Sequence, residues 1–185
     1  MRPSLELSIS VLLLAIAGPA TAEVVAAQAD GLQVRETATI AATPARVYAA
    51  LGRIGSWWSS AHTFSGDSRN LHLDLKAGGC MCEQLPGGGS ALHQTVVYAD
   101  PGKHLRLTGG LGPMQQFAAA GVTDWSIQPA PGGSKVVLSY SIGGYAPGGL
   151  AAIAPAVDGV LAEQLARLKS YVQTGRAPAT PRPPG

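Results

Sequence analysis

The stretch AATPARVYAAL, residues 41–51, joins a predicted strand to a predicted helix and so decides the fold. Before it, residues 32–40 carry Val, Thr and Ile with rough alternation, which is typical of a strand. Thr43 is of a residue type preferred at the N-cap. Pro44 suits the first helical position, because a backbone N–H there would have no partner within the helix. We therefore expect a strand over residues 32–40, a helix over 44–51 and a second short helix over 54–60.

Beyond residue 60 the apolar residues recur at every second position, which is the period of a half-buried strand. Leu71, Leu73 and Leu75, for example, alternate with polar residues. Turn sequences such as DPG at 100–102 separate the runs. Short strands at this spacing predict a meandering antiparallel sheet. The expected strands span residues 71–75, 80–85, 91–99, 103–109, 121–128 and 135–142.

Residues 150–174 carry the pattern of a long amphipathic helix, because apolar residues recur at steps of four and three. Pro155 either begins the regular helix, after a short turn, or kinks its first turn, since proline cannot donate a backbone N–H. Gly175 is a suitable helix stop, and the Pro-rich residues 175–185 predict a disordered tail. The apolar positions are Ile153, Val157, Leu161, Leu165, Leu168 and Val172.

The N-terminus is typical of an export signal. Arg2 gives a positive start, residues 9–17 form an apolar run, and ATA at 20–22 supplies small residues before a cleavage point. The run is shorter than the roughly 20 residues of a membrane span, although a retained anchor is the alternative. We predict a signal peptide over 1–22, a mobile leader over 23–30, and a periplasmic or secreted protein with no membrane span after signal removal.

The composition excludes several classes of function. The formal net charge is +2, charged residues make up 13% of the chain, and no cluster of Lys or Arg occurs, so we expect no nucleic-acid partner. The glycine run at 87–89 lacks the Lys and Ser/Thr that a phosphate-binding loop carries after it, and no nucleophile elbow is present. We therefore predict no cofactor.

The order of these elements resembles the START-like (SRPBCC) superfamily, which includes the birch pollen allergen, polyketide cyclases and activators of the large heat-shock ATPase. The resemblance implies an α+β helix-grip domain over residues 31–174, in the order β-α-α-β6-α. In such a domain a curved, seven-stranded antiparallel sheet surrounds the C-terminal helix, with a ligand cavity between them. It implies no shared set of catalytic residues. It is carried by TPARVYAAL at 43–51, WW at 57–58, LKAGG at 75–79, DPGK at 100–103 and the terminal helix.

Large side chains are expected to line this cavity. Trp57 and Trp58 would point about 100° apart on a helix, so one can enter the cavity while the other covers its mouth, unless both simply cap the core. Tyr145 lies in a Gly-rich segment that is flexible enough for a lid, with a plain connector as the alternative. The predicted lining is Trp57, Trp58, Met81, Trp125, Tyr140, Tyr145, Leu161 and Leu165.

Glu83 is the candidate catalytic residue. In the resembling families, alternate residues after the paired glycines face inward, which here selects Met81 and Glu83. A carboxylate in an apolar cavity has a raised pKa and can serve as general acid or base. His62 or His93 could be its partner, and we name Glu83 and His62 as the candidate pair. The opposite strand register would expose Glu83 to solvent.

Cys80 and Cys82 lie two residues apart, so on a strand their side chains share one face. Three states stay open: two half-buried thiols, a small and easily reduced disulfide, or part of a metal site. The four His residues show no spacing that would complete a metal site, and we predict none.

The predicted function is binding or transport of a small apolar or amphipathic molecule in the cell envelope. The alternative is a cyclase- or hydratase-type enzyme that uses Glu83 and His62. A co-chaperone, which the heat-shock activators suggest, would need ATP and a chaperone that the predicted compartment lacks. A protein-interaction role on the convex sheet face is the remaining alternative. We favour the binding protein over the enzyme.

Overall fold

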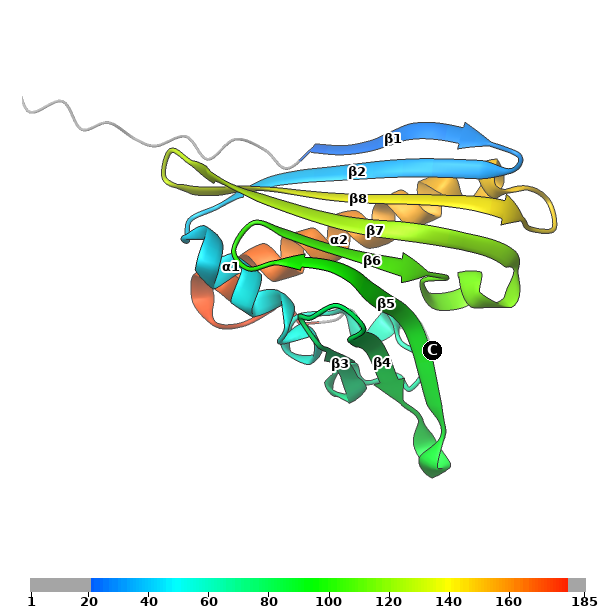
Figure 1. Ribbon diagram of the computed structural model, residues 1–185, viewed down its shortest axis with the longest axis horizontal. Coiled ribbons are helices and arrows are strands. Elements are labelled where there is room, and N and C mark those ends of the chain that lie inside the picture. The colour runs from blue at the N-terminus through cyan, green and yellow to red at the C-terminus, as the bar shows by residue number, and fades with distance from the viewer. Residues whose placement is uncertain (1–20, 180–185) are drawn as a thin grey trace, which may run out of the picture.

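The computed structural model describes residues 21–179, which form one curved antiparallel sheet around a long C-terminal helix (Figure 1). The sheet has eight strands in the order β1-β2-β8-β7-β6-β5-β4-β3. This confirms the predicted α+β helix-grip architecture, with one strand more than expected. The strands are β1 (Thr21–Gln28), β2 (Gly31–Ile40), β3 (Leu71–Leu73), β4 (Cys80–Gln84), β5 (Ser90–Asp100), β6 (His104–Gly109), β7 (Ala118–Ala130) and β8 (Gly133–Tyr145).

The additional strand is β1, where the sequence predicted a mobile leader over residues 23–30. That prediction is wrong, because β1 pairs with β2 from Thr21 opposite Thr37 to Gln28 opposite Gly31. The turn between the two strands is also held, since the carbonyl of Ala29 accepts a hydrogen bond from the amide of Leu150 at 2.9 Å. Residues 1–20 lie outside the described residues, so the export signal over 1–22 stays a prediction.

Helix α1 (Pro44–Leu51) begins as predicted. The Thr43 hydroxyl accepts a hydrogen bond from the amide of Arg46 at 3.4 Å, and Pro44 occupies the first turn. The second short helix, expected over 54–60, is instead two separate 3₁₀ turns, Ile54–Ser56 and Ser60–His62. Gly55 lies close to the backbone of residues 68–71, where a Cβ atom would meet two carbonyl oxygens at 3.0–3.1 Å.

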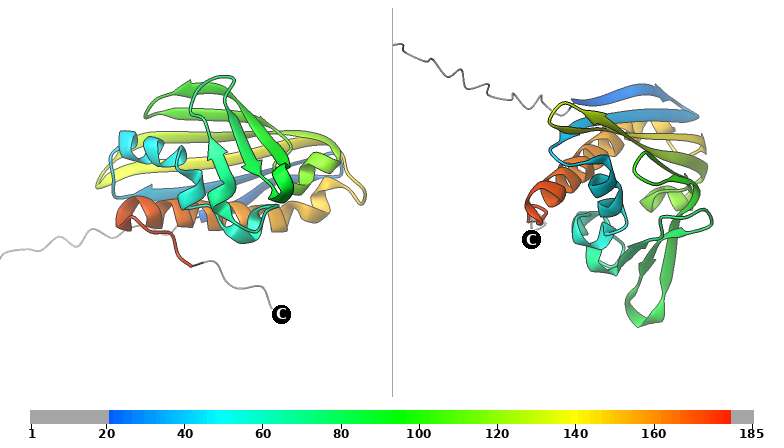
Figure 2. Two further views of the ribbon diagram at one scale, coloured as in Figure 1. Left: turned by 90° about the horizontal axis from the view of Figure 1, so that it is seen from below. Right: turned by 60° about the vertical axis from the view of Figure 1, so that its left-hand side comes forward.

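Helix α2 (Ala154–Thr174) follows a 3₁₀ turn at Leu150–Ile153, so Pro155 sits in the first helical turn after a short preceding turn. Gly175 ends the helix in the left-handed conformation that favours glycine, with φ 78°. Both helices lie on the concave side of the sheet (Figure 2). The predicted disordered tail over 175–185 lies mostly outside the described residues. The apolar residues of α2 that are buried include Leu161, Leu165, Leu168 and Val172.

The centre of the molecule is packed with aromatic side chains. Trp57 and Trp125 meet edge to face with ring centroids 6.1 Å apart, and the Trp57 indole donates to the carbonyl of Ala50 at 2.8 Å. The space left between them and the middle of α2 is only about 20 Å³. Among the helices between residues 21 and 179, none combines the length and the apolar character needed to cross a membrane.

Candidate functional site

A pocket of about 330 Å³ opens beside this packed centre, between the first half of α2 and the segment around residues 58–64. Its walls are mainly apolar, and its polar side chains are His62, Thr63, His93 and the hydroxyl of Tyr140. The other lining residues are Trp58, Ala61, Phe64, Leu111, Pro113, Met114, Ile153, Ala156, Val157, Val160 and Leu161.

The residues predicted to line a cavity divide into three groups. Trp58, Tyr140 and Leu161 line the pocket. Trp57, Met81 and Trp125 line only the small space at the centre. This space is small because the two indole rings occupy most of the centre. Leu165 is buried in the core without reaching either space, and the side chain of Tyr145 is 70% exposed and covers no part of the pocket.

Glu83 points inward from β4, in the predicted register, and only 1% of its surface is exposed. Its carboxylate accepts a hydrogen bond from the backbone amide of Phe64 at 3.1 Å, and another from the amide of Ser65. The third donor is Nε2 of His93, at 2.9 Å. Glu83 therefore holds two parts of the pocket in place. It binds the backbone of Phe64 and Ser65 at the rim, and it binds the imidazole of His93 in the wall.

A β-bulge brings His93 to this position. The pairing of β4 with β5 shifts between Met81 opposite Gln94 and Cys82 opposite Leu92, which leaves His93 as the extra residue of β5. His93 and Gln94 are consequently both buried, although neighbours on a regular strand point to opposite faces. Strict alternation from the sequence does not reveal this placement of two neighbouring side chains on one face.

The hydrogen bonds of His93 define its tautomer. Because the Glu83 carboxylate accepts, Nε2 carries the proton, and Nδ1 is left to accept from the side-chain amide of Gln115 at 3.3 Å. Gln115 belongs to the 3₁₀ turn Gly112–Gln116 between β6 and β7. The ring of Phe64 stacks on the imidazole with centroids 5.3 Å apart. The result is a chain of hydrogen bonds, Glu83–His93–Gln115, whose middle member lines the pocket.

The pKa of Glu83 corrects the expectation of a carboxylic acid that is protonated near neutral pH. Burial alone would raise this pKa, but the hydrogen bonds from Ser65, His93 and Phe64 outweigh burial and lower it. Glu83 is therefore a carboxylate whose oxygens are occupied by donors. It orients His93 and has no proton to give to a ligand.

His62 is not the partner of Glu83. Its Nε2 lies 3.0 Å from the carboxylate of Glu163 on α2, at the mouth of the pocket, where both side chains are about one-third exposed. The expected pair Glu83–His62 is thus replaced by the pair Glu83–His93. Both histidines were candidates from the sequence. His62 is instead paired with Glu163, which lies 101 residues away in the chain.

Polar side chains of α2 hold the segment that carries Trp58 and His62. Arg167 is buried, and its guanidinium donates to the carbonyl of Trp57 at 2.8 Å and to that of Trp58 at 3.4 Å. Gln164, also buried, accepts from the amide of Ser59 at 2.9 Å. Because these contacts satisfy otherwise buried backbone groups, they fix the rim of the pocket against the helix.

Tyr140 provides a polar group inside the pocket. Its hydroxyl accepts a weak hydrogen bond from the amide of Leu111 at 3.4 Å, and burial raises its pKa to about 12, so it stays a phenol at physiological pH. The ring has room because Gly121 faces it. A Cβ atom at position 121 would lie 2.6 Å from a carbon of this ring.

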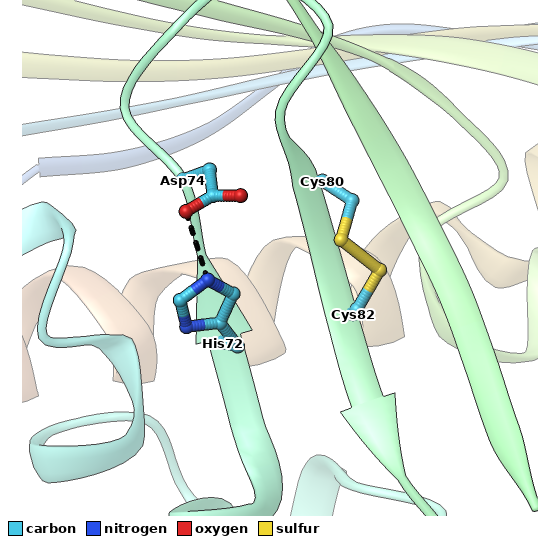
Figure 3. Close-up of a disulfide and its surroundings, with 4 residues drawn as sticks. All are labelled: His72, Asp74, Cys80 and Cys82. Carbon is cyan, nitrogen blue, oxygen red and sulfur yellow. Dashed lines mark hydrogen bonds and ion pairs between the residues drawn. A yellow bond between two sulfur atoms is a disulfide. The ribbon is translucent and has the colours of Figure 1, made fainter.

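Cys80 and Cys82 form a disulfide, which decides among the three states left open by the sequence (Figure 3). Their side chains lie on the outer face of β4, opposite to Met81 and Glu83. Within residues 21–179, no group of three or more His, Cys, Asp or Glu side chains is arranged to hold a metal ion.

The sequence matches the family described as "Polyketide cyclase / dehydrase and lipid transport" over residues 31–173. The chain belongs to this family, and with it to the SRPBCC superfamily. A search of the curated proteins found no match.

Solved structures share the fold at low sequence identity. A conserved protein of unknown function from Enterococcus faecalis is 15% identical with a TM-score of 0.60, and the alignment covers 88% of this chain and 82% of that one. An uncharacterized protein from Rhizobium leguminosarum is 17% identical with a TM-score of 0.57, covering 84% and 98%. A protein of the dynemicin biosynthetic locus is 17% identical with a TM-score of 0.53, covering 78% and 48%. These likenesses establish the fold alone.

Proposed function

We propose that this protein binds a small apolar or amphipathic molecule in the pocket between α2 and the segment of residues 58–64. The observation that carries the proposal is the pocket itself: about 330 Å³, with mainly apolar walls and a few polar groups. Small-molecule sites have this character and volumes of about 300–1,000 Å³. Membership of a family described by cyclase, dehydrase and lipid-transport functions supports the same proposal.

The polar groups suggest how such a molecule would be oriented. Tyr140 offers a phenol at one wall, and His62 offers an imidazole near the mouth. An apolar body with a hydroxyl or carbonyl group fits this arrangement, because the apolar part is removed from water while the polar group keeps a hydrogen bond. We further propose that the protein acts in the cell envelope, on the basis of the predicted export signal.

Two measurements test the binding function. Native mass spectrometry of the protein as purified would identify a copurified molecule, and the dye anilinonaphthalene sulfonate would report on the apolar pocket. Val157→Trp introduces a large ring into the pocket wall and should weaken dye binding at least about tenfold, since a filled pocket cannot bury the dye. Val97→Trp, on the exposed outer part of β5, is the matched control and should leave binding unchanged.

If Val157→Trp folds, as judged by circular dichroism, and binds the dye like the parent protein, the dye does not report on this pocket. Absence of any copurified molecule together with that result would contradict the binding function.

A second candidate is an enzyme of the cyclase or hydratase kind. The specific observation in its favour is the hydrogen-bonded chain Glu83–His93–Gln115 in the pocket wall. A buried carboxylate that fixes the tautomer of a histidine is a common arrangement for a general base. In this version His93 replaces His62 as the base and Glu83 positions it, and the ligand must displace the amide of Gln115 before Nδ1 can take a proton.

The enzyme is tested by incubating the molecule identified by mass spectrometry with the protein and following its conversion. His93→Gln should abolish conversion while leaving binding of the molecule within about threefold, because glutamine can still donate to Glu83 but is no base. Equal conversion by both proteins would exclude His93 as the base.

A further inference from the structure

The outer face of β3 and β4 carries a second chemically reactive group, the Cys80–Cys82 disulfide, away from the pocket (Figure 3). Along β4 the two cysteines alternate with Met81 and Glu83, which face inward. Both cysteines are half-buried on the outer side, so part of each residue is open to solvent.

The disulfide joins residues only two apart in the sequence. A bridge stabilises a fold mainly by restricting the unfolded chain, and this restriction grows with the length of the loop that it closes. Here the loop is minimal, and β4 is already paired with β3 on one side and β5 on the other. The bridge therefore adds little to stability, and a structural role does not explain it.

The neighbours of the disulfide suit thiol chemistry. His72 on β3 stands directly opposite Cys82 in the antiparallel register, and its Nε2 lies 2.9 Å from the carboxylate of Asp74. The side chains of His72 and Asp74 are 65% and 43% exposed, respectively. His72 is thus the cross-strand neighbour of Cys82. A protonated imidazole near a cysteine favours the thiolate, which is the reactive form.

We propose that Cys80 and Cys82 form a thiol–disulfide exchange site for low-molecular-weight thiols of the glutathione class. A thiolate of the small molecule attacks one cysteine sulfur, the S–S bond breaks, and the other cysteine leaves as a thiolate that takes up a proton. A second small thiolate attacks the mixed disulfide and releases the second cysteine, which is also protonated. Two electrons pass to the protein, and the two small thiols become one disulfide.

The test uses the full-length protein under native conditions with glutathione as the probe. Samples from buffers of graded ratios of reduced to oxidised glutathione are alkylated, and the thiols are counted by mass spectrometry. We expect reversible conversion between a form with no thiols and a form with both, with unchanged circular dichroism. The rate in the native protein should lie within about tenfold of the rate in urea, because exposed, short-range disulfides need no unfolding.

The proposal is overturned if the bridge resists reduced glutathione in the native state and opens only when the fold is lost. It is equally overturned if oxidised glutathione leaves stable adducts on the reduced protein without closing the bridge. The double variant Cys80→Ser/Cys82→Ser is the blank for alkylation. Should that variant fail to fold, the native titration of the parent protein still decides between the two outcomes.

Discussion

Glu36 on β2 and Asp158 on α2 bring two carboxyl groups together at the contact between sheet and helix. Only 2% of Glu36 is exposed, and one carboxyl oxygen of each residue is buried without a hydrogen-bond partner. Burial, followed by the neighbouring carboxyl group of Asp158, raises the pKa of Glu36 to about 8. The folded protein therefore keeps a proton on Glu36 at neutral pH.

This pair predicts how stability depends on pH. Because the pKa of Glu36 is raised by folding from 4.5 to about 8, its contribution to stability is complete below about 4.5 and is lost as the pH rises through about 8. Glu36→Gln mimics the protonated form and should be more stable than the parent by about 1–2 kcal/mol at mildly alkaline pH. Denaturant unfolding measured at several pH values checks this, and a gain that does not shrink toward acidic pH would contradict it.

Glu83→Gln should have the opposite effect. The pKa of Glu83 is lowered, so its stabilising contribution is present above the ordinary pKa of 4.5 and is lost as the pH falls through the lower folded value. Replacing the carboxylate weakens three hydrogen bonds to a charged acceptor, and we expect a loss of about 2–3 kcal/mol near neutral pH. Glu23→Gln on the exposed part of β1 is the control, with a change within about 0.5 kcal/mol. Equal losses in both variants would argue against this role of Glu83.

Gly121→Ala should disturb the pocket through Tyr140. The added methyl group would lie 2.6–2.8 Å from the ring and its hydroxyl, so the ring must move. We expect a loss of about 1–3 kcal/mol in the free energy of unfolding and weaker dye binding. Gly143→Ala is the matched control, because the nearest atom there is 3.6 Å away. The prediction fails if the two alanine variants bind the dye equally well.

Arg167→Met should release the rim of the pocket. The carbonyls of Trp57 and Trp58 would lose their buried donor, at a cost of about 2–4 kcal/mol. Hydrogen exchange should then speed up in residues 57–62 more than in β7 or β8. The exposed Arg35→Met is the control and should leave exchange unchanged. Uniform acceleration over the whole chain would indicate global destabilisation instead.

Local patterns predicted much of this fold because they act over a few residues. The cap at Thr43 and the stop at Gly175 follow from neighbours in the sequence, whereas the inward register of Glu83 was predicted from the family resemblance. The strand β1 was missed because residues 23–28 show no clear alternation of apolar and polar side chains. Its place depends on pairing with β2, which is a tertiary contact.

The site was harder to predict for two physical reasons. The bulge at His93 depends on how β5 pairs with β4, and it reverses the face that strict alternation assigns. The position of the pocket depends on how completely Trp57 and Trp125 fill the centre, which is a matter of side-chain volume in three dimensions. Neither property is local in sequence, so the sequence alone could give neither the partner of Glu83 nor which of the predicted residues line the pocket.

The indole rings of Trp57 and Trp125 divide helix α2 into two parts that differ in their tolerance to substitution. Substitutions at Val157 and Val160 alter the shape offered to a bound molecule, because both residues line the pocket. Substitutions near Leu165 and Leu168 act on folding and leave selectivity alone. A related chain can therefore acquire a new specificity through the early turns of the helix while the later turns stay as they are.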